Sequence, residues 1–417
     1  MTTIEENVLL TETGPGTPCG EVMRCYWQPA ALSEELPLGG APVPLRLFSE
    51  DLVLFRDDQG RPGLLGIHCA HRGADLSYGR IEDGGLRCIY HGWLYDVSGR
   101  CLEQPGEPAG STFHERVRKR AYPCREVGGI IFAYMGPGEP PALPPYEFIT
   151  APETHRSNSK VFQECNYLQA NEGNLDPVHL SFLHRIFARE TRGQQGLNAA
   201  DTAPTIEAEE TEWGVRIYSI RKAPPDQNYV RVTNYCLPNF SMVSGSAEGY
   251  TVNWHVPIDD EHHWYWQIRF SRLASKDDSP RWNTGRREEV GPDYRKVRNR
   301  ANRYRQDRAT MKTETFTGLG RNFLPHDSCA TEGEGPVQDR TEEHLGATDR
   351  GIMAARSVLL RVIRQVQAGQ DPPMVFRGAQ AAEVPNVVVR NDVLIPNTVD
   401  WHNYWDDESV DQELVRA

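Results

Sequence analysis

Two short motifs place cysteine and histidine at a spacing suited to a metal site. Cys69-x-His71 and Cys88-x-x-His91 lie in two Gly-rich loops, with sixteen residues between His71 and Cys88. Thiolates hold iron strongly and imidazoles are neutral ligands, so two of each suit a two-iron cluster with a less negative potential than an all-Cys cluster. A structural zinc site is the alternative, but zinc fingers pair Cys with Cys and His with His. Because each loop here supplies one of each, we predict an iron cluster.

A second group of possible ligands lies further along the chain. Asp176, His179 and His184 fall within nine positions of the segment CNYLQANEGNLDPVHLSFLH. Two histidines and one carboxylate on Fe(II) leave positions open for O2 beside a substrate. Two histidines on one helix are by themselves weak evidence, but they occur here together with the Cys/His motif. We predict that His179 and His184 bind a single oxygen-activating iron.

The elements that would carry these residues divide the chain into two predicted domains. From Pro44 to His68, short apolar runs broken by turn sequences indicate strands, after a helix around 20–26. The Pro-rich stretch from Gly136 to Phe148 cannot sustain a helix or a central strand and marks the boundary. We predict domains of residues 1–140 and 141–417.

The second domain is predicted to mix helices with one antiparallel sheet. Helical spacing covers 161–185, and a second amphipathic helix ends at Ala368, with Gly369 as its C-terminal cap. The charged segment 279–308 is interpreted as a solvated loop or an exposed helix. Residues 238–244 suit either a pocket wall or a plain buried strand. Four segments alternate as strands do: WGVRIYSI, NYVRVTNYCL, YTVNWHVPI and HWYWQIRFSR.

Composition excludes several classes of function. A chain of 417 residues with 38% hydrophobic and 25% charged residues is typical of a soluble two-domain protein. The net charge of −13 argues against a nucleic-acid partner. No apolar run is long enough to span a membrane, and the polar N-terminus does not resemble a signal peptide, so we expect a cytoplasmic protein. Nine scattered cysteines do not suggest a disulfide framework.

The chain resembles the Rieske non-haem iron aromatic-ring oxygenases over nearly its full length. The resemblance is carried by GPGTPCGEVMRCYWQP, both Cys/His loops, PGEPAGSTFHERVR and the segment with the two histidines. Its details look most like the phthalate dioxygenase branch, which includes aryl O-demethylases. The resemblance implies an α+β fold, with an N-terminal all-β Rieske domain and a C-terminal helix-grip-like domain. It also implies that Cys69 and Cys88 hold one iron of the [2Fe-2S] cluster, and His71 and His91 the other.

The resemblance further implies a third ligand to the mononuclear Fe(II), far downstream near the start of a helix. In the family this is often an Asp followed by a basic residue. Asp339, followed by Arg340, fits that description and is the predicted ligand. Glu332 and Glu334 remain competing candidates, and Asp327 is a more remote one.

By the same resemblance Asp176 does not bind iron but bridges to a cluster histidine, His91, of the neighbouring subunit. A carboxylate that touches a metal-bound histidine fixes its ring and couples its protonation to the cluster. The alternative for Asp176 is a helix-capping residue before Pro177. Asn171 and Glu172 lie one turn earlier and either extend this network or cap and solvate the helix.

These features predict the oxygenase component of a multicomponent system acting on an aromatic substrate, favouring an aromatic acid. The chain has no credible dinucleotide fingerprint, so electrons would come from a separate NAD(P)H reductase, with or without a ferredoxin. A head-to-tail homotrimer would bring the cluster of one subunit to the iron of the next. Dihydroxylation, monohydroxylation and O-demethylation stay open. The alternatives are a Rieske electron-transfer protein without oxygenase activity and a zinc-stabilised interaction protein.

Overall fold

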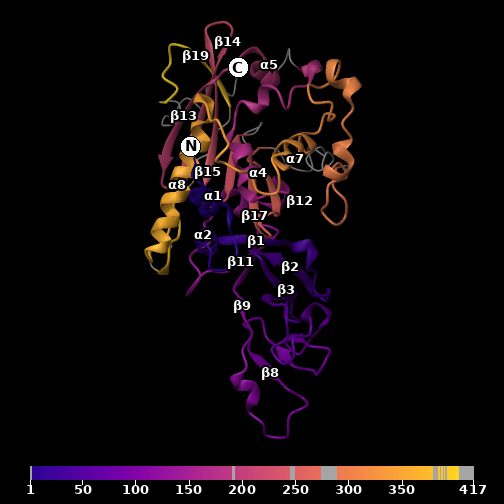
Figure 1. Cartoon of the computed structure of the whole chain (residues 1–417). Helices are drawn as coiled ribbons and strands as arrows, with labels where there is room; N and C mark the ends of the chain where they lie inside the picture. Colours follow the sequence, from indigo (N-terminus) through magenta and orange to yellow (C-terminus); the bar gives the residue numbers. More distant parts are fainter. Residues whose placement is uncertain are drawn as a thin grey trace.

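The structure is a computed structural model that describes residues 2–189, 193–244, 249–273, 289–378, 384, 385, 387, 389 and 392–402. A β-rich tip (residues 43–122), indigo to purple in Figure 1, extends from a larger body of one sheet and several helices. The chain begins in the body, builds the tip, and then returns to the body.

The tip consists of two four-stranded antiparallel sheets, in the orders β2-β3-β4-β9 and β5-β6-β7-β8. Residues of β3 alternate between two cores, because successive side chains of a strand point to opposite faces. Val53 and Phe55 enter the core of the tip, whereas Leu52 and Leu54 enter the core of the body. The strands are β2 Val43–Leu47, β3 Glu50–Arg56, β4 Pro62–Gly66, β5 Arg80–Glu82, β6 Gly85–Arg87, β7 Leu94–Tyr95, β8 Cys101–Glu103 and β9 Ala121–Tyr122.

A small three-stranded sheet joins the tip to the body. It has the order β1-β11-β10, with β1 Trp27–Leu32, β10 Cys124–Val127 and β11 Ile130–Tyr134. Its side chains share one hydrophobic core with the body. The first two helices, α1 Ile4–Thr11 and α2 Pro18–Arg24, also contact the body, through α8. The N-terminal helices therefore pack with the body, and a division at 140/141 stays a prediction.

The body is built on one eight-stranded antiparallel sheet, in the order β12-β18-β17-β16-β15-β14-β13, with β19 paired to β15. This confirms the predicted α+β class and the four predicted strands, which are β14, β15, β17 and β18. The bounds are β12 Arg156–Gln163, β13 Thr205–Thr211, β14 Gly214–Ala223, β15 Gln227–Cys236, β16 Phe240–Ser244, β17 Gly249–Pro257, β18 His263–Ser271 and β19 Val393–Pro396.

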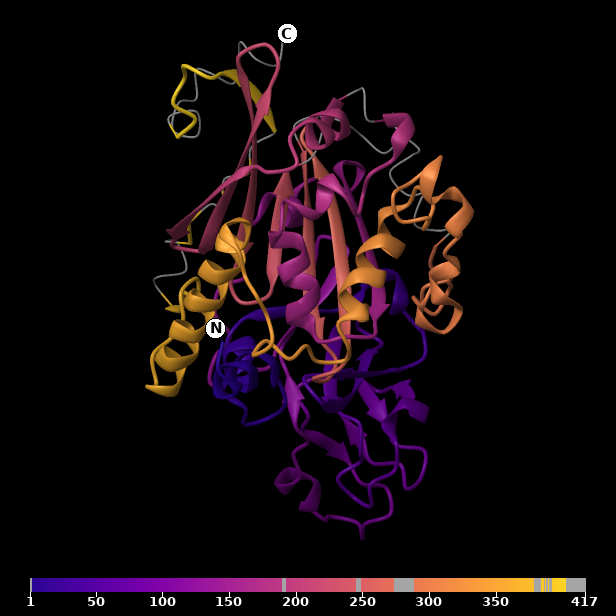
Figure 2. The same cartoon turned by 45° about the horizontal axis from the view of Figure 1, so that its top comes forward.

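Three helices lie across one face of this sheet, as Figure 2 shows. Helix α4 contacts β15, β16 and β17, α8 contacts β13 and β14, and α7 contacts α4. The amphipathic pattern of α8 is confirmed, and Gly369, with φ +76°, follows its end as predicted. The helices of the body are α3 Glu147–Thr150, α4 Tyr167–Leu175, α5 Gly193–Ala200, α7 Phe323–Gly333 and α8 Arg350–Gln367.

Two predicted segments differ from the structure or fall partly outside it. The helix expected over 161–185 is shorter, because its first residues belong to β12 and α4 ends at Leu175. Pro177 explains the early end, since the residue before a proline is disfavoured in helical conformation. A 3-10 turn, η5 His179–Ser181, follows. Of the charged segment 279–308, residues 279–288 lie outside the described residues, and 300–305 form a 3-10 helix.

A buried ionic network fixes α4 relative to α8. The Glu172 carboxylate of α4 accepts hydrogen bonds from the guanidinium groups of Arg340, at 3.0 Å, and Arg356, at 2.5 Å. Arg356 also pairs with Glu343 at 2.5 Å. Glu172 therefore stabilises the position of α4 through these ion pairs. Buried charges are tolerated only when they are paired, so α4, α8 and the segment 340–343 hold one another in place.

Removing the charge of Glu172 should destabilise the body. In Glu172→Gln the guanidinium of Arg340, fully buried, would lose its anion, so we expect a loss of about 3–5 kcal/mol in apparent free energy of unfolding. The matched control is Glu210→Gln, which breaks an exposed pair with Arg361 and should cost less than about 1 kcal/mol. Thermal and urea unfolding of both variants measure the difference. An equally small loss of free energy of unfolding in both would show that the buried network stabilises the fold no more than the exposed pair does.

Candidate functional site: a two-iron loop pair and a His/His/Asp metal centre

The two Cys/His loops of the tip have the same construction. In each, the amide of a glycine four residues after the cysteine donates to the cysteine carbonyl oxygen: Gly73 to Cys69 at 2.9 Å and Gly92 to Cys88 at 3.0 Å. Both glycines have positive φ, +74° and +75°, a conformation that other residues adopt at a cost. The loops therefore present their ligands in equivalent ways.

The four predicted cluster ligands converge between these loops. His71 Nδ1 and His91 Nδ1 lie 3.1 Å apart, and the thiols of Cys69 and Cys88 lie within hydrogen-bonding range of each other. The cysteines are buried, whereas both histidines are exposed. This gives one thiol pair and one imidazole pair, which is the arrangement that a cluster with two differently ligated irons requires.

Two aromatic side chains contact the four predicted cluster ligands and affect their chemistry. The ring of Trp93 stacks on that of His71, with centroids 4.6 Å apart and planes at 9°. The hydroxyl of Tyr95 lies 3.2 Å from the Cys69 sulfur. Hydrogen bonds to cluster sulfurs raise the reduction potential, so Tyr95 is a functional candidate that sequence reasoning missed. Its place in β7, two residues after Trp93, was the available signal.

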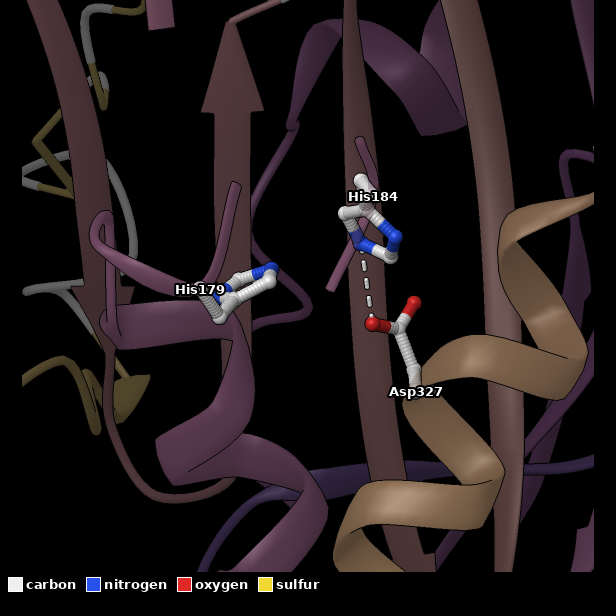
Figure 3. Close-up of side chains that lie close together, drawn as sticks. All are labelled: His179, His184 and Asp327. Carbon is white, nitrogen blue, oxygen red and sulfur yellow. Dashed lines mark ion pairs between the residues drawn. The ribbon is translucent and has the colours of Figure 1, made fainter. Parts of the chain in front are cut away.

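A second metal centre lies in the body, where Figure 3 shows His179, His184 and Asp327 facing one another. Each offers one ligand atom, and these atoms all lie within 4.8 Å of one another. His184 Nε2 is 3.0 Å from Asp327 Oδ1. Two imidazoles and one carboxylate form the set typical of oxygen-activating Fe(II), and the buried His179 Nδ1 has no hydrogen-bond partner within the described residues. The residues therefore fit a mononuclear iron.

The turn that carries the histidines is fixed by a buried arginine of β14. Arg221 donates to the carbonyl oxygen of Pro177 at 2.7 Å and to the Ser181 hydroxyl at 3.4 Å. Asp176 closes the same turn by accepting a hydrogen bond from the amide of Val178 at 2.7 Å. The ligands thus follow α4 on a short irregular segment, not on the continuous helix that their spacing suggested.

The charge and exposure of Asp327 suit a ligand. Partial burial opposes ionisation, but His184 and His179 outweigh it and hold the pKa of the Asp327 carboxyl below its usual value. The side chain of Asp327 is 48% exposed, against 6% for His184, so the centre opens to solvent on the carboxylate side. An open side is what distinguishes a catalytic centre from a closed structural site.

His184 is held by two aromatic neighbours from α7 that sequence reasoning missed. The ring of Phe323 stacks on it with centroids 4.1 Å apart, and His326 Nδ1 lies 3.3 Å from His184 Nδ1. Burial, followed by the charge of His184, lowers the pKa of His326 to about 4, so this ring is neutral. Asn322, which caps α7 through its side chain, was the signal that a helix begins here.

The structure brings Asp327, the more remote candidate, to the two histidines, whereas Asp339, the predicted third ligand, lies outside this group. Asp339 is exposed, and its carboxylate accepts hydrogen bonds from the amide and hydroxyl of Thr341. Its basic neighbour Arg340 turns into the ionic network with Glu172. The Asp-Arg pair therefore has structural partners, and the carboxylate that faces the histidines belongs to the first half of α7.

The other two candidate acids also have different partners or environments. Glu332 is fully buried, ion-paired with Lys296 and hydrogen-bonded to Tyr304. Glu334 is exposed just after the end of α7. Neither belongs to the group that faces the two histidines.

Asp176 lies beside the metal centre but outside the ligand set. Its Oδ2 is 3.7 Å from His179 Nδ1, and its side chain is 28% exposed. Burial opposes its ionisation, yet the neighbouring His179 holds the pKa of Asp176 below its usual value. Asn171 is buried without a side-chain partner in the described chain, and β16, the predicted pocket wall, is a buried strand of the sheet. A bridge from Asp176 to another subunit stays a prediction.

Comparison with known families covers nearly the whole chain. Residues 26–119 match the Rieske [2Fe-2S] domain, and residues 133–416 match the LigXa C-terminal domain like family. The chain is 36% identical to the phthalate 4,5-dioxygenase oxygenase subunit of Pseudomonas putida, over 97% of this chain and 95% of that one. It is 33% identical to the 5,5'-dehydrodivanillate O-demethylase oxygenase subunit of a Sphingobium species, over 90% and 84%.

Solved structures agree in fold. The terminal oxygenase of carbazole 1,9a-dioxygenase from Novosphingobium sp. KA1 superposes with a TM-score of 0.60 at 21% identity, covering 84% of this chain and 96% of that one. The two metal-ligand sets described above lie in the two matched domains. The cofactors are accordingly a Rieske [2Fe-2S] cluster and a mononuclear iron. The chain belongs to the Rieske non-haem iron oxygenases, as an oxygenase component of the phthalate dioxygenase and aryl O-demethylase branch.

Proposed function

We propose that this oxygenase component hydroxylates or O-demethylates an aromatic acid at a mononuclear iron held by His179, His184 and Asp327. The observation that carries the proposal is the convergence of these three side chains in a centre that is open on one side. The relatives named above include a phthalate 4,5-dioxygenase and a 5,5'-dehydrodivanillate O-demethylase, which supports this substrate class.

In the proposed reaction the protein side chains position the metals and the charge around them. When bound, the cluster supplies single electrons and the mononuclear iron supplies O2 activation. His71 and His91 are exposed, so a partner can approach them. Asp327 would offset one of the two positive charges of Fe(II), and with two neutral imidazoles the centre would keep one net positive charge that favours an anionic substrate.

We further propose that electrons pass between subunits. The strands β5–β8 that carry the cluster loops lie in the tip, whereas α4 and α7 lie in the body, so the two sites occupy separate parts of one chain (Figure 1). A head-to-tail homotrimer would place Asp176 of one subunit beside His91 of the next.

No helix in the described residues is long and apolar enough to cross a membrane. A cytoplasmic location, close to a supply of NAD(P)H, completes the proposal.

The electron donor is proposed to be a separate NAD(P)H reductase, acting directly or through a ferredoxin. Carbazole 1,9a-dioxygenase, which shares the fold, has been solved as a complex of its oxygenase with a ferredoxin. A surrogate reductase should therefore reduce the cluster of the purified chain.

Product analysis decides between the oxygenase and a protein that only carries electrons. The chain with a surrogate reductase, NADH and O2 is incubated with a panel of aromatic acids and their methoxylated analogues. From at least one acid we expect either a hydroxylated product that carries oxygen from 18O2, or an O-demethylated phenol that keeps its own oxygen while the methyl carbon leaves as formaldehyde. Cluster reduction without oxygenated product from any compound, in protein shown to hold about three irons per chain, would favour the electron carrier.

The metal centre makes a first prediction that separates two aspartates. Asp327→Ala removes one of three ligands, so iron content should fall from about three to about two per chain while the Rieske spectrum persists. Asp339→Ala is the matched control and should keep its iron, because its carboxylate only caps a turn at Thr341. Elemental analysis with EPR of the reduced cluster measures both, and iron loss in Asp339→Ala alone would reinstate that residue as ligand.

A second prediction concerns Asp176, which contacts His179 without belonging to the ligand set. Asp176→Asn keeps size and a hydrogen-bonding oxygen but removes the charge that favours a protonated cluster histidine of the next subunit. Both metals should remain bound, and reduction by the reductase should be normal. Reoxidation of the cluster by substrate and O2 should slow by orders of magnitude in stopped-flow absorbance. Wild-type rates would make Asp176 a simple turn-closing residue.

A further inference from the structure

The strongest additional feature is a chain of hydrogen bonds that ends on a proposed iron ligand. It starts at the carbonyl oxygen of Gly320, which lies 2.9 Å from His326 Nε2. It continues from His326 Nδ1 to His184 Nδ1, 3.3 Å apart, and His184 Nε2 then faces Asp327 Oδ1 at 3.0 Å. His326 is fully buried and His184 is 5% exposed, so water cannot readily replace these contacts.

The chemistry of the groups fixes the direction of this chain. A carbonyl oxygen only accepts, so His326 Nε2 must carry a proton. In a neutral imidazole the other nitrogen then accepts, so the contact between His326 Nδ1 and His184 Nδ1 is a hydrogen bond only when His184 donates it. His184 is thereby held as the tautomer with its proton on Nδ1. Its Nε2 keeps a free lone pair directed toward the carboxylate of Asp327.

A lone pair facing a carboxylate oxygen at 3.0 Å is unfavourable unless a proton or a metal ion lies between them. Because the contact with His326 keeps the ring proton on Nδ1, it favours the metal ion over the proton at His184 Nε2. The ring is also held against rotation, because Phe323 stacks on it with planes at 20°. Both Phe323 and His326 belong to α7, the helix that supplies Asp327.

We propose that His326 is a positioning residue that orients His184 and sets its tautomer for iron binding. It touches neither the iron nor the substrate and acts through His184 alone. The inference rests on the proposed iron site and adds to it the residue that prepares one ligand. Outer partners of metal-bound histidines typically change metal affinity roughly 10- to 100-fold when they are removed.

Two substitutions of nearly equal shape separate hydrogen bonding from packing. In His326→Gln the side-chain oxygen can accept from His184 Nδ1 while its amide donates to Gly320, so the chain is restored. In His326→Met the volume is similar but both hydrogen bonds are lost. His155→Met is the control, because His155 is half-buried and its Nδ1 contacts the carbonyl oxygen of Ser271, away from the ligand set.

The measurement is the affinity of the mononuclear site for Fe(II), without turnover. Protein stripped of that iron by a chelator is dialysed anaerobically against buffered Fe(II), and iron is counted relative to cluster absorbance. We expect His326→Met to bind Fe(II) roughly 10- to 100-fold more weakly, with His326→Gln and His155→Met close to wild type. Cluster absorbance and thermal unfolding of each variant check that the fold is intact.

Each other outcome counts against the role of His326. Wild-type affinity in His326→Met would show that the ring merely fills space, and a loss of similar size in His326→Gln would assign the effect to packing. If His326→Met does not fold, a loss in His326→Gln still overturns the proposal. His184→Ala, measured alongside, tests the iron site itself: iron retained there would remove the site, whereas iron lost there but kept in His326→Met removes only the inference.

Discussion

The proposed iron centre depends on one packing constraint: α4 and α7 must stay in contact at a fixed register. His179 and His184 follow α4 in the chain, whereas Asp327 and the two rings that hold His184 belong to α7. Three ligands leave a metal with few bonds to the protein, so small shifts between the helices would open the site. The sheet below α4, the network at Glu172 and the anchor of Arg221 on Pro177 all oppose such a shift.

The packing of the body also explains which carboxylate faces the two histidines. Several carboxylates lie near the second half of α7, but most already have a strong partner. Glu332 pairs with the buried ammonium of Lys296, Glu172 with two arginines, and Asp339 closes a turn. Asp327 instead faces imidazoles, which are weak bases and share their nitrogens with a metal. Competition among charged partners, not proximity in sequence, thus selects the anion that faces the histidines.

The two metal sites differ in how local structure prepares them. The cluster loops are almost self-contained, since the amides of Gly73 and Gly92 close each turn on its own cysteine. The mononuclear centre is assembled from residues about 140 positions apart and needs the tertiary fold to exist. Its histidines are tuned by partners on another helix. The tip, whose loops are closed by local turns, would therefore hold the cluster, and the body, which brings distant segments together, would hold the mononuclear iron of the proposed electron path.

The sequence alone predicted the α+β class and four strands of the main sheet, which the structure confirms. It also named the four Cys/His cluster candidates and the two histidines, which the structure brings together in two groups. These follow from short-range spacing, turn chemistry and alternation, which local segments express by themselves. It favoured Asp339 over the more remote Asp327 as the third ligand, because the sequence does not show that Arg340 turns inward toward Glu172. It also could not show that His326 and Phe323 hold His184. Contacts between segments far apart in the chain depend on helix packing over the sheet, and no local pattern encodes that geometry.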